Sequence, residues 1–195
     1  MLFKSQITDL YHRTAMWRRH KEKEDLRAIL EEKRRILQKE QRDELSEAII
    51  SRLVELPEFK DAKVILAYYP IKNEVNLRSL LEEYRDKKMI LLPAVIRHGR
   101  RLELRQYAGR EDLRRGRFGI PEPQTPKYKG GVDLVIVPGV GFDEGMHRLG
   151  RGGGYYDRFL KGRPSTPKVA VAYDFQIVKE IPHNFLDKKV SPFVD

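Results

Sequence analysis

A glycine-rich segment, GRGGG, is the part of the sequence best suited to chemistry on a phosphorylated ligand. It holds four glycines in five positions, namely Gly150, Gly152, Gly153 and Gly154. Glycine has no Cβ, so successive backbone N–H groups can close around phosphate oxygens. A turn that only joined two elements would need one or two glycines, because each one costs backbone entropy on folding. The segment therefore predicts a phosphate-binding loop.

Charged and aromatic residues flank this loop. Arg148 and Arg151 can spread positive charge over the oxygens of a transferring phosphoryl group. Tyr155 begins a predicted helix, and a helix N-terminus favours an anion. Asp157 lies about one turn into that helix, and a carboxylate beside phosphates is a typical Mg²⁺ ligand. Tyr155 and Tyr156 can stack on a ring, donate a hydroxyl, or pack in the core.

Two standard nucleotide motifs are close to this segment, but neither is complete. The stretch GMHRLG has the four-residue gap of a P-loop, yet Arg151 and Gly152 stand where Lys and Ser or Thr belong. The preceding GVG follows a predicted strand, yet Glu144 occupies the place of the third glycine of a dinucleotide fingerprint. The expectation of phosphate binding therefore rests on the chemistry of the residues.

Alternating strands and helices must position these residues. Apolar runs predict strands within 63–70, 89–95, 132–138 and 168–173, and an alternating run at 101–107 predicts an edge or antiparallel strand. Helices are predicted over 21–56 with a bend in QKEQRDE, over 76–88 with Asn76 as a cap, and over 155–162. This order predicts an α/β fold with a mainly parallel or mixed sheet flanked by helices. Ligands bind at the carboxyl ends of such strands, where YYPIKNE, LPAVIRHGR and VPGVGFDEG follow.

The first predicted helix carries two apolar stripes that indicate its buried face. One stripe comprises Leu26, Ile29, Leu30, Lys33, Ile36 and Leu37, and the other comprises Leu45, Ile49, Ile50, Leu53 and Leu56. Their i, i+3, i+4, i+7 spacing is typical of an amphipathic helix. Pro57 should end the helical run.

Composition limits the class of protein. The chain has 195 residues, no cysteine and a net charge of +10, with 35% charged residues, a composition that leans towards a thermophile. No apolar run of about 18 residues suggests a membrane span. Residues 1–20 are basic and poor in acids, which predicts a flexible leader, with a targeting presequence as the alternative. Residues 21–195 are predicted to form a single catalytic domain.

The segment VPGVGFDEGMHRLGRGGGYYDRFL resembles the signature of the 5-formyltetrahydrofolate cyclo-ligase family, the 5,10-methenyltetrahydrofolate synthetases. KEDLRAIL resembles the family's first helix, YYPIKNEV its substrate segment and FGIPEP its mid-chain loop, so the resemblance covers about Lys23 to Asp187. It implies an ATP- and Mg²⁺-dependent ligase that converts 5-formyltetrahydrofolate to 5,10-methenyltetrahydrofolate. ATP would phosphorylate the formyl oxygen, N10 would attack the activated carbon, and ADP and phosphate would be released. It also implies a fold like that of sugar-phosphate isomerases and CoA transferases.

Residue roles carry over from the resemblance one position at a time. Lys23 and Arg27 match the family's N-terminal ATP contacts, and their i, i+4 spacing places both on one helix face. Glu74 matches the substrate-binding glutamate, and Tyr69 aligns with a neighbouring substrate contact. Phe118 sits where the family often has an aromatic residue beside the folate.

The glycine segment carries the remaining roles that the resemblance implies. Arg148 and the residues Gly150, Arg151, Gly152, Gly153, Gly154, Tyr155 and Tyr156 match the cradle for phosphate and folate. Arg148 and Glu74 are the candidate catalytic residues. Asp157 and Asp187 match magnesium ligands, and Leu186 stands where bacterial relatives often have His.

Two other readings of the sequence remain. The basic leader and the stretch MWRRHKEK could belong to a non-catalytic nucleic-acid- or nucleotide-binding module, although acids interleave densely through the helices. The second alternative is a folate-binding paralogue without activity, and the presence of Arg148 and Asp157 argues against it. The leading expectation is a cytoplasmic, monomeric enzyme that acts on 5-formyltetrahydrofolate, including polyglutamylated forms, with neither a nucleic-acid nor a membrane partner.

Overall fold

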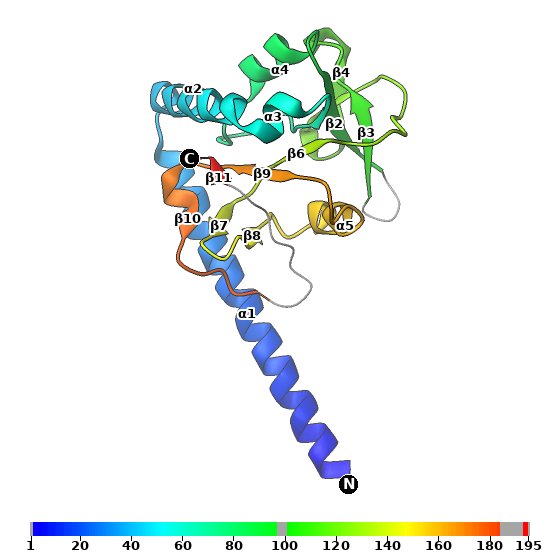
Figure 1. Cartoon of the computed structure of the whole chain (residues 1–195). Helices are drawn as coiled ribbons and strands as arrows, with labels where there is room; N and C mark the ends of the chain where they lie inside the picture. The colour runs from blue at the N-terminus through cyan, green and yellow to red at the C-terminus, as the bar shows by residue number, and fades with distance from the viewer. Residues whose placement is uncertain (1, 97–100, 184–192, 195) are drawn as a thin grey trace.

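The computed structural model describes residues 2–96, 101–183 and 193–194, and the side chains of residues 16–96 and 101–183. Its centre is a six-stranded sheet of order β11-β9-β6-β1-β2-β3 (Figure 1). The strands are β1 Val64–Leu66, β2 Met89–Val95, β3 Leu102–Gln106, β6 Leu134–Val137, β9 Lys168–Val171 and β11 Phe193–Val194. All neighbours run parallel except β2 and β3. The predicted α/β class and the antiparallel edge strand are therefore confirmed, while the finer likeness to sugar-phosphate isomerases stays a prediction.

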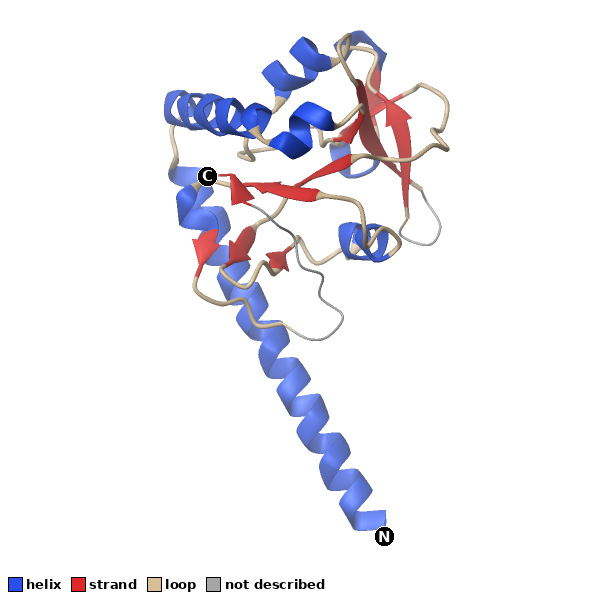
Figure 2. Cartoon of the chain, in the orientation of Figure 1, coloured by secondary structure: helices blue, strands red, loops and turns tan. Residues whose placement is uncertain are grey.

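Helices cover both faces of this sheet (Figure 2). On one face lie α2 Lys39–Glu55, α3 Pro57–Asp61 and α4 Arg78–Tyr84, whose side chains pack with Ile65, Ile90 and Ile136. On the other face, α5 Tyr155–Lys161 packs Phe159 and Leu160 against Leu66 and Val137. Successive residues of a strand point to opposite faces of the sheet. Because helices cover both faces, both sets of side chains are apolar, and the strand appears in the sequence as a continuous apolar run.

The long helix α1, Leu2–Ile36, packs its C-terminal part beside a small sheet of order β10-β7-β8. The strands of that sheet are β7 Gly141–Asp143, β8 Arg148–Leu149 and β10 Ile177–Val178. Leu30 of α1 joins Val140, Leu149 and Ile181 in a separate apolar cluster there. Figure 1 shows the N-terminal part of α1 extending away from the rest of the molecule. The leader is helical in the structure, and its division from a catalytic domain stays a prediction.

The two predicted apolar stripes were partly wrong. On α1, Ile29 is 55% and Ile36 65% exposed and Lys33 is exposed, whereas Leu30 and Arg34 are buried. On α2, Leu45 is 42% exposed, whereas Ile49, Ile50 and Leu53 are buried as predicted. The buried face of α1 follows an i, i+4 row because only a narrow stripe of this helix meets the small sheet.

The helix boundaries lie near their predicted places. The bend falls at Leu37–Gln38, where Gln38 and Gln41 form a capping box that starts α2. Pro57 follows the end of α2 and is the first residue of α3, a position that does not need its missing N–H. The N-cap residue of α4 is Leu77 and not Asn76 as predicted, although the Asn76 side chain still accepts a hydrogen bond from the backbone N–H of Arg78 at 3.3 Å.

Short strands lie just before the glycine loop and around FGIPEP, the mid-chain loop of the family resemblance. The β7–β8 hairpin comes directly before GRGGG, and in it Gly141 pairs with Leu149 and Phe142 with Arg148. The stretch 109–131 holds the hairpin of β4 Leu113–Arg115 and β5 Pro121–Pro123. It also holds the 3₁₀ turns Arg110–Asp112 and Arg117–Gly119. Pairings of two or three residues leave too short a periodicity to read from sequence. Among the described residues, no helix is long and apolar enough to cross a membrane.

Candidate active site

A cavity of about 430 Å³ opens at the carboxyl ends of β1, β2 and β6. Segments that follow these strands line it, together with the 118–122 stretch and the glycine loop. The following predicted site residues line the cavity: Tyr69, Glu74, Phe118, Arg148, Gly150, Arg151, Gly153, Gly154, Tyr155 and Tyr156. The topology thus gathers residues from distant parts of the chain at the edge where ligands of parallel sheets bind.

Arg148 is a buried cation in the wall of this cavity. Its side chain is 6% exposed, and its Nη2 donates to Oδ1 of Asp157 at 2.6 Å. Its Nη1 donates to the carbonyl oxygen of Pro138 at 3.2 Å, and its guanidinium lies over the ring of Tyr156 at 5.6 Å. Its Nε has no hydrogen-bond partner among the described atoms. Contacts on several sides therefore hold the guanidinium in one orientation.

Aromatic side chains line the cavity together with Arg148, among them Tyr155, Tyr156 and Phe118. The Tyr156 hydroxyl is buried and has no hydrogen-bond partner within the described part of the chain. Burial and then the nearby Glu74 carboxylate raise the pKa of Tyr156, although Arg148 opposes this, so the hydroxyl keeps its proton. Tyr155 meets the ring of Phe118 edge to face, with the centroids 6.0 Å apart. Phe118 is 66% exposed, and its ring therefore offers an apolar face to a ligand rather than to the core.

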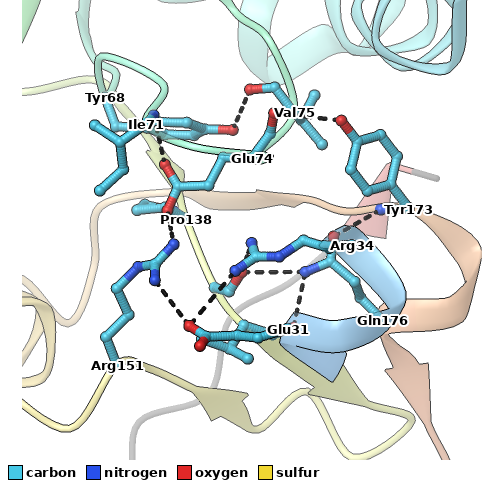
Figure 3. A network of polar contacts seen from close by, with 12 residues as sticks. Glu31, Arg34, Tyr68, Ile71, Glu74, Val75, Pro138, Arg151, Tyr173 and Gln176 are labelled. Atoms are coloured by element: carbon cyan, nitrogen blue, oxygen red, sulfur yellow. Dashed lines mark hydrogen bonds and ion pairs between the residues drawn. The ribbon is translucent and has the colours of Figure 1, made fainter. Parts of the chain in front are cut away.

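Glu74 and Arg151 form an ion pair at the edge of the cavity (Figure 3). Arg151 Nη2 lies 3.1 Å from Oε1 of Glu74, whose side chain is only 10% exposed, and Nη1 lies 2.8 Å from Oε1 of Glu31 on α1. The other carboxylate oxygen of Glu74 accepts the backbone N–H of Ile71 at 3.2 Å. Arg151 therefore links the substrate segment predicted from sequence to the first helix.

A hydrogen bond joins the glycine loop directly to α1. Arg27 donates its Nε–H to the carbonyl oxygen of Gly150 at 2.8 Å, a contact between residues 123 positions apart. Lys23 lies one turn before Arg27 on the same helix. Gly152 and Gly154 have φ of +89° and +66°, which side chains rarely adopt. A Cβ on Gly150 would lie 2.8 Å from Nη1 of Arg148, so this glycine lets the arginine lie against the loop.

Some predicted residues lie outside the cavity wall. Lys23, Arg27, Gly152 and Asp157 do not line it. Asp187 lies outside the described residues, so its pairing with Asp157 around a metal stays a prediction. Asp157 has its Oδ1 engaged by Arg148, but its side chain is 38% exposed and remains accessible to an ion.

The sequence reading missed two kinds of residue at this site. Arg34 is 4% exposed and reaches towards the carbonyl oxygen of Gly139 at 3.5 Å, beside Gln176, which donates to the same oxygen at 3.1 Å (Figure 3). Its seven-residue spacing from Arg27 was the available signal, because residues two turns apart share a helix face. Of the apolar lining, Pro93 and Val95 lie in the segment LPAVIRHGR that was expected at the ligand edge, and Ile120 lies in the FGIPEP loop, but Leu102 had no signal that separated it from the core.

The residues fit a ligand with phosphate groups and a flat ring. The donors include a buried guanidinium, an unpartnered hydroxyl and glycine backbone, and the neighbouring wall is aromatic and apolar. Phosphate oxygens accept charge-assisted hydrogen bonds from Arg. A largely apolar cavity with a few converging polar groups is typical of small-molecule sites.

Comparison with known proteins agrees with this chemistry. The family model of the 5-formyltetrahydrofolate cyclo-ligase family matches residues 19–194. A probable 5-formyltetrahydrofolate cyclo-ligase of Schizosaccharomyces pombe is 33% identical over 192 residues, covering 88% of this chain and 94% of the relative. The 5-formyltetrahydrofolate cyclo-ligase of Escherichia coli is 30% identical, covering 79% and 89%. A relative in Arabidopsis thaliana is named mitochondrial.

Solved structures agree as well. The NMR structure of 5,10-methenyltetrahydrofolate synthetase from Aquifex aeolicus superposes with a TM-score of 0.78 at 41% identity, covering 88% of each chain. A 5,10-methenyltetrahydrofolate synthetase from Mycoplasma pneumoniae superposes with a TM-score of 0.72 at 26% identity. With the family model matched over nearly the whole length and relatives above 30% identity, the chain belongs to the 5-formyltetrahydrofolate cyclo-ligase family.

Proposed function

We propose that this chain performs its family's reaction, the ATP-dependent conversion of 5-formyltetrahydrofolate to 5,10-methenyltetrahydrofolate, in the 430 Å³ cavity beside the glycine loop. The proposal rests on two buried polar atoms that have no hydrogen-bond partner among the described atoms. Arg148 Nε and the Tyr156 hydroxyl are both buried, both belong to residues that line the cavity, and neither has a partner among the described atoms. Buried polar groups are nearly always hydrogen-bonded in a native protein. A bound ligand with acceptor oxygens would satisfy both once neighbouring side chains shift, because neither atom is exposed to solvent.

Arg148 would stabilise negative charge as the formyl oxygen and a phosphoryl group react. Its guanidinium is already oriented by Asp157 and Pro138, so it needs little rearrangement when charge develops. The protonated Tyr156 hydroxyl would donate a second hydrogen bond. ATP supplies the phosphoryl group that turns the poor formyl-oxygen leaving group into phosphate, which departs when N10 attacks.

The other site residues would bind and orient. Tyr155 and Phe118 offer ring faces to the pteridine, and Tyr69 lines the same wall. Glu74 would accept a hydrogen bond from a ring nitrogen once Arg151 turns towards the phosphates. Arg151 can make that exchange because its side chain is 34% exposed and its partners within the described part of the chain are the carboxylates of Glu31 and Glu74.

Arg27, Lys23 and the loop Gly150–Gly154 are the residues that we assign to the phosphates of ATP. The contact from Arg27 to the Gly150 carbonyl brings the helix and the loop together. For Mg²⁺ we assign Asp157 and Asp187, since carboxylate oxygens are the ligands that this ion prefers. Mg²⁺ would neutralise phosphate charge there.

A second cleft of about 520 Å³ adjoins the cavity and shares Lys72 and Glu74 with it. Basic side chains outnumber acidic ones in its wall, among them Arg42, Arg78 and Arg110. Folates end in glutamate carboxylates, so we assign this cleft to the glutamate tail and expect polyglutamylated substrate to fit it. We further expect the enzyme to act as a cytoplasmic monomer without a nucleic-acid partner.

The test is an absorbance assay for the methenyl product with 5-formyltetrahydrofolate, Mg²⁺ and ATP, beside an ATP-free control. We expect an ATP-dependent rise with the wild-type chain and a loss of turnover of about 10²-fold or more with Arg148→Ala, because it removes charge stabilisation in the transition state. Arg114→Ala, an exposed arginine outside the cavity wall, is the matched control and should keep full turnover. Equal turnover for the wild-type and Arg148→Ala proteins would reject the assigned role.

A further inference from the structure

Asp143, His147 and His183 form a cluster away from the active site. One ligand atom from each residue lies within 4.8 Å of those from the other two. Asp143 ends β7, His147 lies just before β8, and His183 follows β10. None of the three lines either of the two cavities described above. The phosphate and folate chemistry of the chain therefore gives no role to this cluster.

Hydrogen bonds fix which ring nitrogens carry protons. Nδ1 of His147 lies 3.1 Å from both carboxylate oxygens of Asp143, and Nδ1 of His183 lies 3.0 Å from the carbonyl oxygen of Ile181. A carboxylate and a carbonyl only accept, so each Nδ1 is the protonated nitrogen. In the neutral rings each Nε2 then carries a lone pair. A carboxylate or carbonyl behind Nδ1 is the usual arrangement for a histidine that binds metal through Nε2.

The carboxylate behind His147 is held firmly. Asp143 is 1% exposed and also accepts the backbone N–H groups of His147 at 2.8 Å and Ile181 at 2.9 Å. Burial acts to raise the pKa of Asp143, but these hydrogen bonds and His147 outweigh it and leave the pKa lowered. The side chain of His147 is 12% exposed, so its ring is fixed, whereas His183 is exposed and can turn.

We propose that His147 and His183 bind a divalent transition-metal ion through their Nε2 atoms, with Asp143 as the outer partner that orients His147. The rings are stacked, with centroids 3.6 Å apart and planes at 14°. Parallel rings do not aim their lone pairs at one point, so binding requires the exposed His183 ring to tilt out of the stack. Water would complete the coordination shell.

Imidazole nitrogen selects the class of ion. Zn²⁺, Ni²⁺, Cu²⁺ and Co²⁺ accept imidazole, whereas Mg²⁺ prefers oxygen and keeps its waters. The site is therefore chemically separate from the Mg²⁺ expected at Asp157. A bound ion would join the β7–β8 hairpin to the segment after β10 and so stabilise the small sheet that packs on α1.

Co²⁺ titration of the full chain tests the proposal, followed by visible absorption and calorimetry. We expect one site whose affinity falls at least about 10-fold in His183→Gln and in His147→Gln. His20→Gln is the matched control, because His20 is an exposed histidine beside a carboxylate, 3.2 Å from Glu24, and it should bind Co²⁺ like the wild type. Zn²⁺ should displace Co²⁺, and Mg²⁺ in excess should not.

The measurement also decides the alternative that the two rings only stack as neutral groups. Failure of the wild-type chain to bind Co²⁺ would overturn the proposal, and so would unchanged affinity in His183→Gln. Since His183 is exposed, its variant should fold, and a far-ultraviolet circular dichroism spectrum like that of the wild type establishes this. A rise in melting temperature with Zn²⁺ that disappears in His183→Gln would support the proposed role in the small sheet.

Discussion

Replacing Asp157 by Asn separates two roles of that carboxylate, as the partner of Arg148 and as a proposed ligand of Mg²⁺. Asn keeps the shape and one acceptor oxygen and removes the charge. The structure shows what is lost, an ion pair of 2.6 Å between Oδ1 and the Nη2 of an arginine side chain that is 6% exposed. The variant therefore leaves a buried cation without its counter-charge.

The expected loss in the free energy of unfolding depends on how deeply the ion pair between Arg148 and Asp157 is buried. Removing one partner of a fully buried ion pair costs about 3–5 kcal/mol. Asp157 is 38% exposed, so water already screens part of the interaction, and Asn retains a hydrogen-bond acceptor. We therefore expect the free energy of unfolding to fall by about 1–2 kcal/mol. For a chain of this length, that lowers the melting temperature by roughly 2–8 °C.

Thermal unfolding followed by circular dichroism measures the change. Asp86→Asn is the matched control, since Asp86 is 88% exposed and lies 3.7 Å from Arg85. An exposed pair of this kind contributes little, so its melting temperature should shift by no more than about 2 °C. If Asp157→Asn melts with the control, the ion pair does not stabilise the fold and the reasoning from burial fails.

A magnesium titration of the same variant then tests the second role. If Asp157 binds Mg²⁺, the concentration for half-maximal turnover should rise, because one charged oxygen ligand is gone. If Asp157 only orients Arg148, turnover at saturating Mg²⁺ should fall while that concentration stays the same. An unaltered titration curve would remove Asp157 from the set of metal ligands.

Two further substitutions test other contacts. Tyr156→Phe removes a buried hydroxyl that has no partner among the described atoms, so the melting temperature should stay the same or rise. Turnover should fall about 10-fold, which corresponds to the loss of one hydrogen bond to the ligand. Full turnover would show that the hydroxyl does not contact the substrate. Gly141→Ala places a Cβ 2.5 Å from Cδ1 of Leu30 and should cost about 1–3 kcal/mol in urea unfolding. Gly131→Ala meets no atom within 4 Å and is its control, and equal midpoints for the two variants would contradict the close packing of α1 on the hairpin.

Local patterns in the sequence were enough for the main elements and for much of the chemistry. Continuous apolar runs marked β1, β2, β6 and β9 because a parallel strand is covered on both faces. Arg148, the glycine loop and Asp157 stood out because their types suit phosphate and cation binding within a few residues of one another. The rule that parallel strands present their carboxyl ends at one edge predicted the place of the segment that holds Glu74, whereas Phe118 and Tyr156 were expected beside the folate only from the family resemblance.

Only the tertiary structure decided how these residues meet. No periodicity shows that Arg27 reaches the carbonyl of Gly150, or that Arg151 joins Glu31 to Glu74, because these contacts cross 77 to 123 positions of the chain. The burial of Arg34 and the exposure of Ile29 likewise depend on which narrow face of α1 meets the small sheet. Composition and spacing determine which side chains lie on each helix and strand. Long-range packing determines which of them become hydrogen-bond or ion-pair partners, because polar groups that are buried together must pair with each other in place of water.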